Sequence, residues 1–242
     1  MRNEIRRLAD VVGERVKNDI TEEKLQEAVV LKNRERKALV DFYRLGQLNP
    51  PALSGQDILK VVYGATFKFD KRALIDEIDA LTDKVKQEYA EGKRLESRPR
   101  ILITGCPIGG AAEKVVRAVE ENGGWVVGYE NCSGAKANEA MVDESGDVYD
   151  ALAKKYLAIG CSCMSPNPNR TKLLGEMIEE YQVDGVIDVI LQACHTYAVE
   201  SLTIKRFVKE HYDVPYMAIE TDYSQSDIGQ LNTRAAAFIE ML

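Results

Sequence analysis

One stretch decides the fold, Gly185-Val-Ile-Asp-Val-Ile-Leu-Gln-Ala-Cys194. Its apolar run is the most continuous in the chain and predicts a strand from 186 to 191, followed by a helix across 199–211. A nearly unbroken apolar run is typical of a strand buried on both faces, as in a parallel sheet. The strand leads into a cysteine, which places a thiol at its carboxyl end.

Three other apolar runs repeat this pattern of strand followed by helix. They predict strands at 100–104, 125–129 and 214–222, and the segments between and after the strands predict helices at 111–122, 149–157, 170–181 and 229–242. Apolar strands that alternate with helices build a sheet covered on both faces. The predicted fold class is therefore α/β, a Rossmann-like lobe of about four parallel strands flanked by helices.

The residues before 98 predict helices instead. Leu8, Val11, Val12 and Val16 have the spacing of one helical face, and a further helix is expected from 71 to about 91. Thr21 and Ser54 stand where N-caps are expected, the second with capping-box spacing to Asp57. We expect two parts, a helical segment at 1–97 that packs on the main lobe and the Rossmann-like lobe at 98–242.

Composition narrows the class of protein. The chain has 242 residues, 45% of them hydrophobic, and a net charge of -7, which argues against non-specific nucleic-acid binding. No apolar run is long enough to cross a bilayer, and the first residues lack a signal-peptide core. We therefore expect a cytoplasmic protein with no membrane contact.

The five cysteines all follow residue 105, and at least three of them follow predicted strands. In an open α/β sheet, ligands gather outside the carboxyl ends of the strands, so we expect these thiols to converge there. Cysteines of a cytosolic protein favour thiolate chemistry, metal ligation or buried thiols over a disulfide framework. The sequence therefore predicts a metal or redox site that draws on Cys106, Cys132, Cys161, Cys163 and Cys194.

The pair Cys161-Ser-Cys163 lies in a predicted loop rich in turn formers. A C-x-C pair can place two thiolates on one metal centre, or one thiolate on each of two neighbouring centres. Its spacing matches neither the redox C-x-x-C motif nor a zinc ribbon. The alternative interpretation is a pair of small, half-buried residues.

His195 directly follows Cys194, and two interpretations of it stay open. Its imidazole either donates a hydrogen bond to a cluster sulfur or a substrate, or caps the next helix. Glu220 and Asp222 end the last predicted strand, and we expect them to cap the helix that starts near 226–229, with proton donation as the alternative. The turn Gly105-Cys-Pro-Ile-Gly-Gly110 has no dinucleotide or Walker pattern, but its glycines allow close backbone approach to an anion.

Several motifs occur together in the order of one known family. They are Gly105-Cys106-Pro107, Glu130-Asn131-Cys132-Ser133-Gly134, Cys161-Ser162-Cys163-Met164, the run from Val186 to Tyr197, and Glu220-Thr221-Asp222-Tyr223-Ser224. The chain from about residue 20 onward resembles the C-terminal half of 2-hydroxyacyl-CoA dehydratase family proteins, most closely the branch of double-cubane cluster proteins. The run around Cys194 is the most specific part of the match.

The resemblance implies an iron–sulfur protein, a 4Fe-4S or double-cubane type. It implies low-potential reduction of a small molecule or radical dehydration of a 2-hydroxyacyl-CoA, with electrons from a separate ATP-hydrolysing iron–sulfur activator. By the same resemblance Cys132 and Cys194 are the foremost candidate ligands, then Cys161 and Cys163, then Cys106. A homodimer is also implied.

Full members of that family have an N-terminal lobe with further cysteine ligands. By resemblance we expect the chain to be a C-terminal lobe, either a fragment or one half of a split protein that is completed by a partner. A double cubane needs about six thiolates, one more than the chain holds. Two rival functions stay open, a zinc-binding protein without turnover and a metal-free, non-catalytic Rossmann-like module with inert cysteines.

Overall fold

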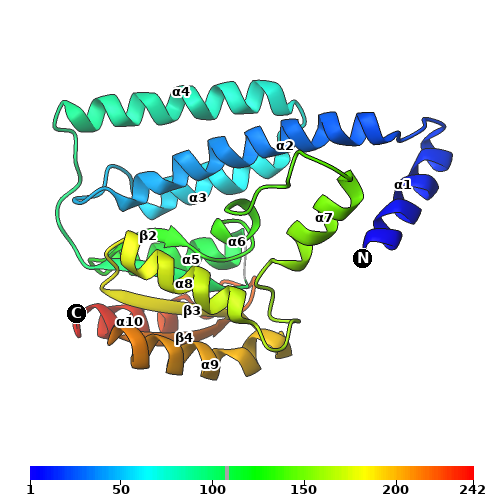
Figure 1. Ribbon diagram of the computed structural model, residues 1–242. Coiled ribbons are helices and arrows are strands. Elements are labelled where there is room, and N and C mark those ends of the chain that lie inside the picture. The colour runs from blue at the N-terminus through cyan, green and yellow to red at the C-terminus, as the bar shows by residue number, and fades with distance from the viewer. Residues whose placement is uncertain (107–108) are drawn as a thin grey trace.

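The computed structural model describes residues 1–106 and 109–242, and these contain a four-stranded sheet. The strands are β1 (Arg100–Gly105), β2 (Trp125–Tyr129), β3 (Gly185–Leu191) and β4 (Tyr216–Thr221), all parallel and in the order β2-β1-β3-β4. The α/β class and the parallel sheet predicted from the sequence are confirmed (Figure 1). The apolar run before Cys194 forms β3, an inner strand of this sheet.

The strand register brings the carboxyl ends of the inner strands together. β1 pairs with β3 from Ile101 opposite Gly185 to Gly105 opposite Val189, and β3 continues to Leu191, which pairs with the last residue of β4. All six residues of β1 are buried, as is most of β3. The loops that follow these strands therefore begin at one edge of the sheet. In open parallel sheets, ligands bind at this edge.

Helices cover both faces of the sheet. α5 (Gly110–Glu121) packs with α10 (Ile228–Ile239), whereas α8 (Pro168–Glu180) packs with α9 (His195–Tyr212). The crossovers β1-α5-β2 and β3-α9-β4 run in opposite directions along the sheet, so their common right-handedness places α5 and α9 on opposite faces. α9 starts at His195, four residues before the predicted helix, because only three residues separate it from β3.

The N-terminal region is helical, as predicted. It contains α1 (Arg2–Val16), α2 (Glu22–Tyr43), α3 (Gly55–Gly64), α4 (Lys71–Ala90) and the 3-10 turns η1 (Arg44–Gln47) and η2 (Ala65–Phe67). Figure 1 shows α2, α3 and α4 stacked together on one side of the sheet. The Thr21 hydroxyl accepts the Lys24 N–H at 3.3 Å and the Ser54 hydroxyl accepts the Asp57 N–H at 3.1 Å, so both predicted caps are confirmed.

One hydrophobic core runs from these helices into the sheet. Phe42, Ile58 and Ile75 of α2, α3 and α4 belong to the same buried cluster as Ile103 and Ile187 of the inner strands. Burial of apolar side chains on this scale is the main force that holds the helices to the sheet.

Arg100, at the start of β1, adds a polar link between the same two regions. The residue is 4% exposed, and its guanidinium donates to the carbonyl oxygens of Gly46 at 2.7 Å, Leu48 at 3.0 Å and Tyr181 at 2.8 Å. The three acceptors belong to the η1 segment and to the turn after α8. Charged hydrogen bonds to these carbonyls compensate for burial of the cation.

The apolar face predicted for the first helix is present but faces solvent. Leu8 is 61% exposed and Val16 59%, whereas the buried side of α1 is formed by Ala9 and Gly13. Ala9 joins a small second cluster with Tyr149 of α7 (Val148–Leu157), the helix on which α1 packs. In the part of the chain that the structure describes, no helix has both the length and the apolar character needed to span a bilayer.

Candidate functional site

The carboxyl edge of the sheet gathers the segments that carry all five cysteines. Cys106 directly follows β1, Cys132 lies three residues beyond β2, and Cys194 lies three residues beyond β3. Cys161 and Cys163 lie in the loop between α7 and α8. Cys132 and Cys163 are exposed, while the other three thiols are half-buried.

Cys106 and Cys194 form the most firmly held thiol pair. The Cys106 thiol accepts the Leu191 N–H at 3.2 Å, and the Cys106 N–H donates to the Val189 carbonyl at 3.0 Å. Burial, with a smaller contribution from the neighbouring Cys194 thiol, raises the pKa of Cys106 to about 11, against the Leu191 hydrogen bond. The backbone of β3 therefore fixes this thiol, which stays protonated at neutral pH.

This close approach of two strands depends on Gly105. Its φ is 110°, and a Cβ at this position would lie 2.0 Å from the Val189 carbonyl oxygen. Only glycine fits both restrictions. Cys106 thus reaches the edge of β3 because the residue before it has no side chain.

Cys194 is the N-cap residue of α9, and its environment favours the thiolate. The Tyr197 N–H is the largest cause that lowers the pKa of Cys194, and contacts with Thr196 and Cys106 add to it, against a smaller penalty from burial. Unpaired N–H groups at a helix start stabilise negative charge. Ala193, in the turn before it, has a φ of 66°, so the backbone enters this cap through a conformation that is costly for a residue with a Cβ.

Cys161 and Cys163 contact each other in the loop between α7 and α8, which side chains rather than strand backbone hold in place. A hydrogen bond with Cys161 is the largest cause that raises the pKa of Cys163. The Asn167 side-chain amide donates to the Cys161 carbonyl at 3.1 Å and to the Glu200 carboxylate at 2.7 Å. Asn167 thus joins the loop to α9, and the Ser162 hydroxyl adds a second link by donating to the Thr196 hydroxyl at 3.0 Å.

Cys132 lies against the hydroxyl of Tyr197, with 4.0 Å between its sulfur and the Tyr197 oxygen. Cys132 is also among the neighbours that raise the pKa of Cys106, and both Cys132 and Cys161 are among those that raise the pKa of Tyr197. The structure therefore brings the five thiols to one edge, as two pairs and a fifth thiol, Cys132, beside Tyr197.

The thiols fit an iron–sulfur cluster by donor type, because such clusters are held by cysteine thiolates. Within residues 1–106 and 109–242, however, no three Cys, His, Asp or Glu side chains lie close enough together to hold a metal ion. The described residues offer pairs of sulfur donors. A full set of ligands needs movement of the loops or donors from elsewhere.

Beneath the thiols lies a buried network of ions that the sequence argument did not predict. Glu130, Arg170 and Asp188 are each fully buried. The Arg170 guanidinium lies 3.4 Å from the Asp188 carboxylate, 3.7 Å from that of Glu130 and 2.5 Å from that of Glu200. Burial opposes the charge of Arg170, but these carboxylates outweigh it and raise its pKa.

The network extends to β1 and β4, the two strands that flank β3. The Thr104 hydroxyl donates to the Glu130 carboxylate at 2.6 Å, and the Tyr216 hydroxyl donates to the Asp188 carboxylate at 2.8 Å. Burial raises the pKa of Asp188, with Arg170 opposing it. Asp188 sits in the middle of an apolar strand, Val186-Ile-Asp-Val-Ile190, and this exception in an otherwise apolar run was the sequence signal for a buried charge.

A cavity of about 770 Å³ opens beside the thiol edge. Its walls come from the cysteine loop, the start of α8 and the first turns of α9, and include Ser162, Met164, Asn167, His195, Val199 and Glu200. Among the described residues that form these walls, none is a lysine or an arginine. The lining is neutral or apolar except for His195 and Glu200, and Glu200 is already paired with Arg170.

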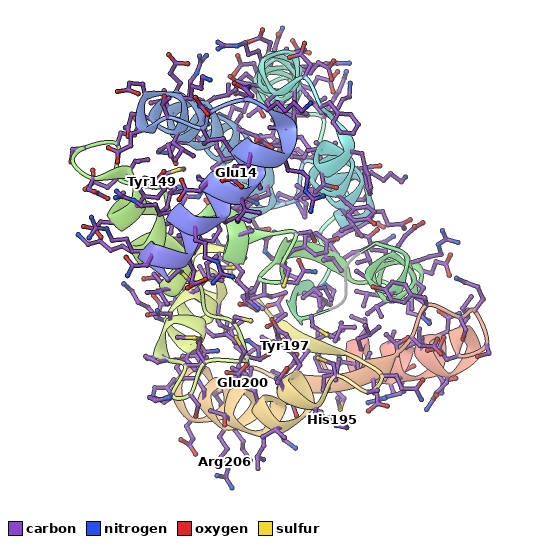
Figure 2. The ribbon with its side chains drawn as sticks, turned by 90° about the vertical axis from the view of Figure 1, so that its right-hand side faces the viewer. Glu14, Tyr149, His195, Tyr197, Glu200 and Arg206 are labelled. Carbon is purple, nitrogen blue, oxygen red and sulfur yellow. The ribbon has the colours of Figure 1, made fainter. Side chains whose placement is uncertain are left out.

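His195 begins α9 and is exposed, and its imidazole makes no hydrogen bond with the residues described. The helix-cap interpretation of His195 is wrong, because Cys194 occupies the N-cap position. Figure 2 shows Tyr197 and Glu200 on the inner side of α9, while His195 and Arg206 point away from it. The His195 side chain therefore lines the cavity and takes no part in the contacts between the thiols.

The capping roles expected for Glu220 and Asp222 are also wrong. Asp227 is the N-cap residue of α10. The Asp222 carboxylate instead accepts the Ser224 N–H at 2.7 Å and lies 3.7 Å from the Lys114 ammonium, whereas Glu220 is exposed. The sequence did not distinguish these three nearby carboxylates, because the turn between β4 and α10 decides which one reaches the helix start.

The turn expected to approach an anion, 105–110, lies only partly within the described residues. Pro107 and Ile108 fall outside them, so that motif stays a prediction. Gly110 begins α5, as the helix expected from 111 requires.

Comparison with known proteins places the chain among dehydratase components. It is 72% identical over 239 residues to YjiM of Escherichia coli (strain K12), a protein named, by inference, as a dehydratase subunit; the match covers 99% of this chain and 62% of YjiM. It is 26% identical over 226 residues to the (R)-phenyllactyl-CoA dehydratase beta subunit of Clostridium sporogenes, with 93% and 59% covered. The chain thus spans about three fifths of the length of both relatives.

A third, shorter match is to a subunit of the benzoyl-CoA reductase of Thauera aromatica, 25% identical over 133 residues, which covers 54% of this chain and 30% of that relative. The family model described as 2-hydroxyglutaryl-CoA dehydratase, D-component, matches residues 1–242. The family resemblance drawn from the cysteine motifs is confirmed. Because that match extends over all 242 residues, the chain belongs to the 2-hydroxyglutaryl-CoA dehydratase D-component family.

Proposed function

We propose that this chain is the thiol-bearing lobe of an iron–sulfur component that acts on a 2-hydroxyacyl-CoA or a related small molecule. The observation that carries the proposal is the convergence of five thiols at the carboxyl edge of the sheet, next to a cavity of about 770 Å³. Family membership and the names of the dehydratase and reductase relatives support the reaction class.

Cys106, Cys132 and Cys194 would hold a cluster from the strand ends, with Cys161 and Cys163 contributing from the loop. Such a cluster supplies one-electron transfer at low potential. The chain's own part is to supply and position the thiol ligands. The start of α9 lowers the pKa of Cys194, and Cys106 is held by the Leu191 N–H.

The cavity beside these thiols is suited to the uncharged part of a substrate. Met164, Val199 and two prolines give it apolar surface, and its described walls hold no lysine or arginine that could pair with phosphate groups. An acyl group fits this lining. We therefore place the acyl end of the substrate here and its phosphates elsewhere, with His195 as a hydrogen-bonding group at the rim.

The proposed partners follow from the family and from the length of the relatives. About two fifths of each dehydratase relative lies outside the match, so we propose that a further lobe or partner subunit completes the ligand set. We also propose electron supply by a separate ATP-hydrolysing iron–sulfur activator, and a homodimeric assembly. In number, the five thiols suffice for a single cubane, whereas a double cubane needs about six and so one from the further lobe or partner.

Metal analysis on anaerobically purified protein tests the proposal. Iron, acid-labile sulfide and zinc are measured per chain, with and without the remaining lobe, alongside a visible spectrum before and after dithionite. Iron and sulfide in equal amounts, with a band that bleaches on reduction, support the cluster. Stoichiometric zinc without sulfide in both samples would contradict it and favour the zinc-binding alternative.

Variants then assign the ligands. Cys132→Ser and Cys194→Ser should each lower bound iron sharply, whereas Ser165→Ala, which alters an exposed residue of the cysteine loop, should leave iron unchanged. Unaltered iron in both cysteine variants overturns the ligand assignment. Zinc-free, iron-free protein with slow thiol modification in every sample would favour the metal-free alternative.

A further inference from the structure

Tyr197 is an aromatic side chain at the thiol edge, and nothing in the proposed ligand set explains its surroundings. It is 4% exposed and lies in the first turn of α9, facing the sheet (Figure 2). The Lys136 ammonium lies 4.9 Å from its ring centre and the Arg170 guanidinium 4.8 Å. Two buried cations therefore flank one ring, a costly arrangement that cation–π attraction and paired carboxylates stabilise.

The hydrogen bonds of the Tyr197 hydroxyl have a determined direction. The Lys136 ammonium lies 2.7 Å from the hydroxyl oxygen and has only protons to give, so the tyrosine oxygen accepts in this bond. Its own single proton is left for another acceptor. Among the residues described, the other hydrogen-bonding neighbour of this oxygen is the Cys132 sulfur at 4.0 Å.

Lys136 cannot easily turn away from this role. It is 5% exposed, and its ammonium is also paired with the Glu130 carboxylate at 3.2 Å. Glu130 is in turn held by the Thr104 hydroxyl. A chain of fixed groups thus runs from β1 through Glu130 and Lys136 to the tyrosine, and ends at the sulfur.

We infer that Tyr197 is a positioning residue whose hydroxyl, oriented by Lys136, donates a hydrogen bond to the sulfur of Cys132. For a bound cluster this inference rests on the proposed function; for the free thiolate it does not. A donor aimed at a ligand sulfur holds that ligand in place and raises the reduction potential of a cluster, because it stabilises the more negative, reduced state.

The metal-free chain provides the first test. The rate of Cys132 alkylation by iodoacetamide is followed by peptide mass spectrometry as a function of pH, in the unaltered chain and in Tyr197→Phe. Loss of a hydrogen bond to a thiolate should move the Cys132 profile to higher pH and slow its alkylation near pH 7.5 by about tenfold. Alkylation of Cys163 in the same samples serves as the internal reference and should not change.

Tyr216→Phe is the matched control. It also removes a tyrosine hydroxyl from the same ion network, but that hydroxyl bonds Asp188 and not a thiol. Lys136→Gln is a second variant, which removes the charge that orients Tyr197 and should move the profile in the same direction by a smaller amount. An unmoved Cys132 profile in Tyr197→Phe, or an equal shift in Tyr216→Phe, overturns the inference.

The iron-loaded protein, with its remaining lobe, provides the second test. Tyr197→Phe should lower the midpoint potential of the cluster, while Tyr216→Phe should leave it unchanged. A shifted alkylation profile in a protein that binds no iron supports the hydrogen bond and contradicts the proposed function. A cluster whose potential is the same in both variants contradicts the role of Tyr197 while leaving the cluster in place.

Discussion

Two sets of thiols lie at the same edge of this sheet, and they are held in different ways. Cys106 and Cys194 follow inner strands. The Leu191 N–H donates to the Cys106 sulfur, and Cys194 stands at the N-cap of α9, where the start of the helix lowers its pKa. Cys161 and Cys163 lie in a loop, which the side chains of Asn167 and Ser162 link to α9. The comparison teaches that strand ends position a thiol through the backbone, whereas a loop needs a side chain for the same purpose.

The buried ion network is the element that both sets share. Arg170 lies in the first turn of α8, just after the cysteine loop, and reaches Asp188 and Glu130 under the strand ends. Removing it should therefore disturb both sets at once.

The largest effect is expected from Arg170→Met. The change leaves the Glu130 and Asp188 carboxylates buried without their cation and should lower the free energy of unfolding by about 3–5 kcal/mol. Urea unfolding measures it. Arg206→Met, which removes a guanidinium from the outer side of α9 (Figure 2), should change the stability by less than about 0.5 kcal/mol. Equal, small losses in both variants would show that the network does not support the edge.

The next largest effect separates the two members of the strand-held pair. The pKa of Cys194 is lowered by the helix start, whereas burial raises that of Cys106 to about 11. In metal-free protein at pH 7.5, Cys194 should be alkylated at least about a hundredfold faster than Cys106, because the thiolate is the reactive form. Mass spectrometry of alkylated peptides measures both rates, and similar rates would contradict the difference between the two environments.

A smaller effect is expected from changing Asn167, one of the two side chains that link the cysteine loop to α9. Asn167→Ala removes the bonds to the Cys161 carbonyl and to Glu200, and should cost about 1–2 kcal/mol of stability while speeding alkylation of Cys161. Asn169→Ala is the matched control, since Asn169 bonds the Ala158 carbonyl, away from the cysteine pair. If Cys161 reacts no faster in Asn167→Ala than in Asn169→Ala, the loop is held by other contacts.

The smallest effect concerns pH. Because the pKa of Cys106 is higher in the folded chain than its ordinary value of 9.0, the folded state keeps this proton longer than the unfolded state does. The resulting stabilisation is complete below pH 9 and is lost as the pH rises toward about 11. After allowance for the half-exposed position of the thiol, the loss is about 1 kcal/mol. It is measured as the difference between the unaltered chain and Cys106→Ser in urea unfolding at pH 8 and pH 10.5, and a constant difference would contradict it.

The sequence by itself determined the sheet and the placement of the thiol segments. Strands such as β2 and β3 were predicted almost to the residue, because an unbroken apolar run bounded by turns has few alternatives to a buried strand. Three cysteines, Cys106, Cys132 and Cys194, follow strands, and their meeting at one edge of the sheet follows from the common direction of parallel strands. The caps at Thr21 and Ser54 were equally local, since a hydroxyl at a helix start bonds an N–H only two or three residues away.

Only the tertiary structure decided which charged and apolar side chains contact one another. Periodicity placed Leu8 and Val16 on one face of α1, but not which face of that helix packs on α7. Asp188, Arg170 and Lys136 are far apart in the sequence and meet only because α8 and the segment after β2 fold under the same edge. The hydroxyl of Tyr197 gained its direction in the same way, from a lysine 61 residues before it in the chain. Such pairings depend on distances through space, which a linear pattern does not contain.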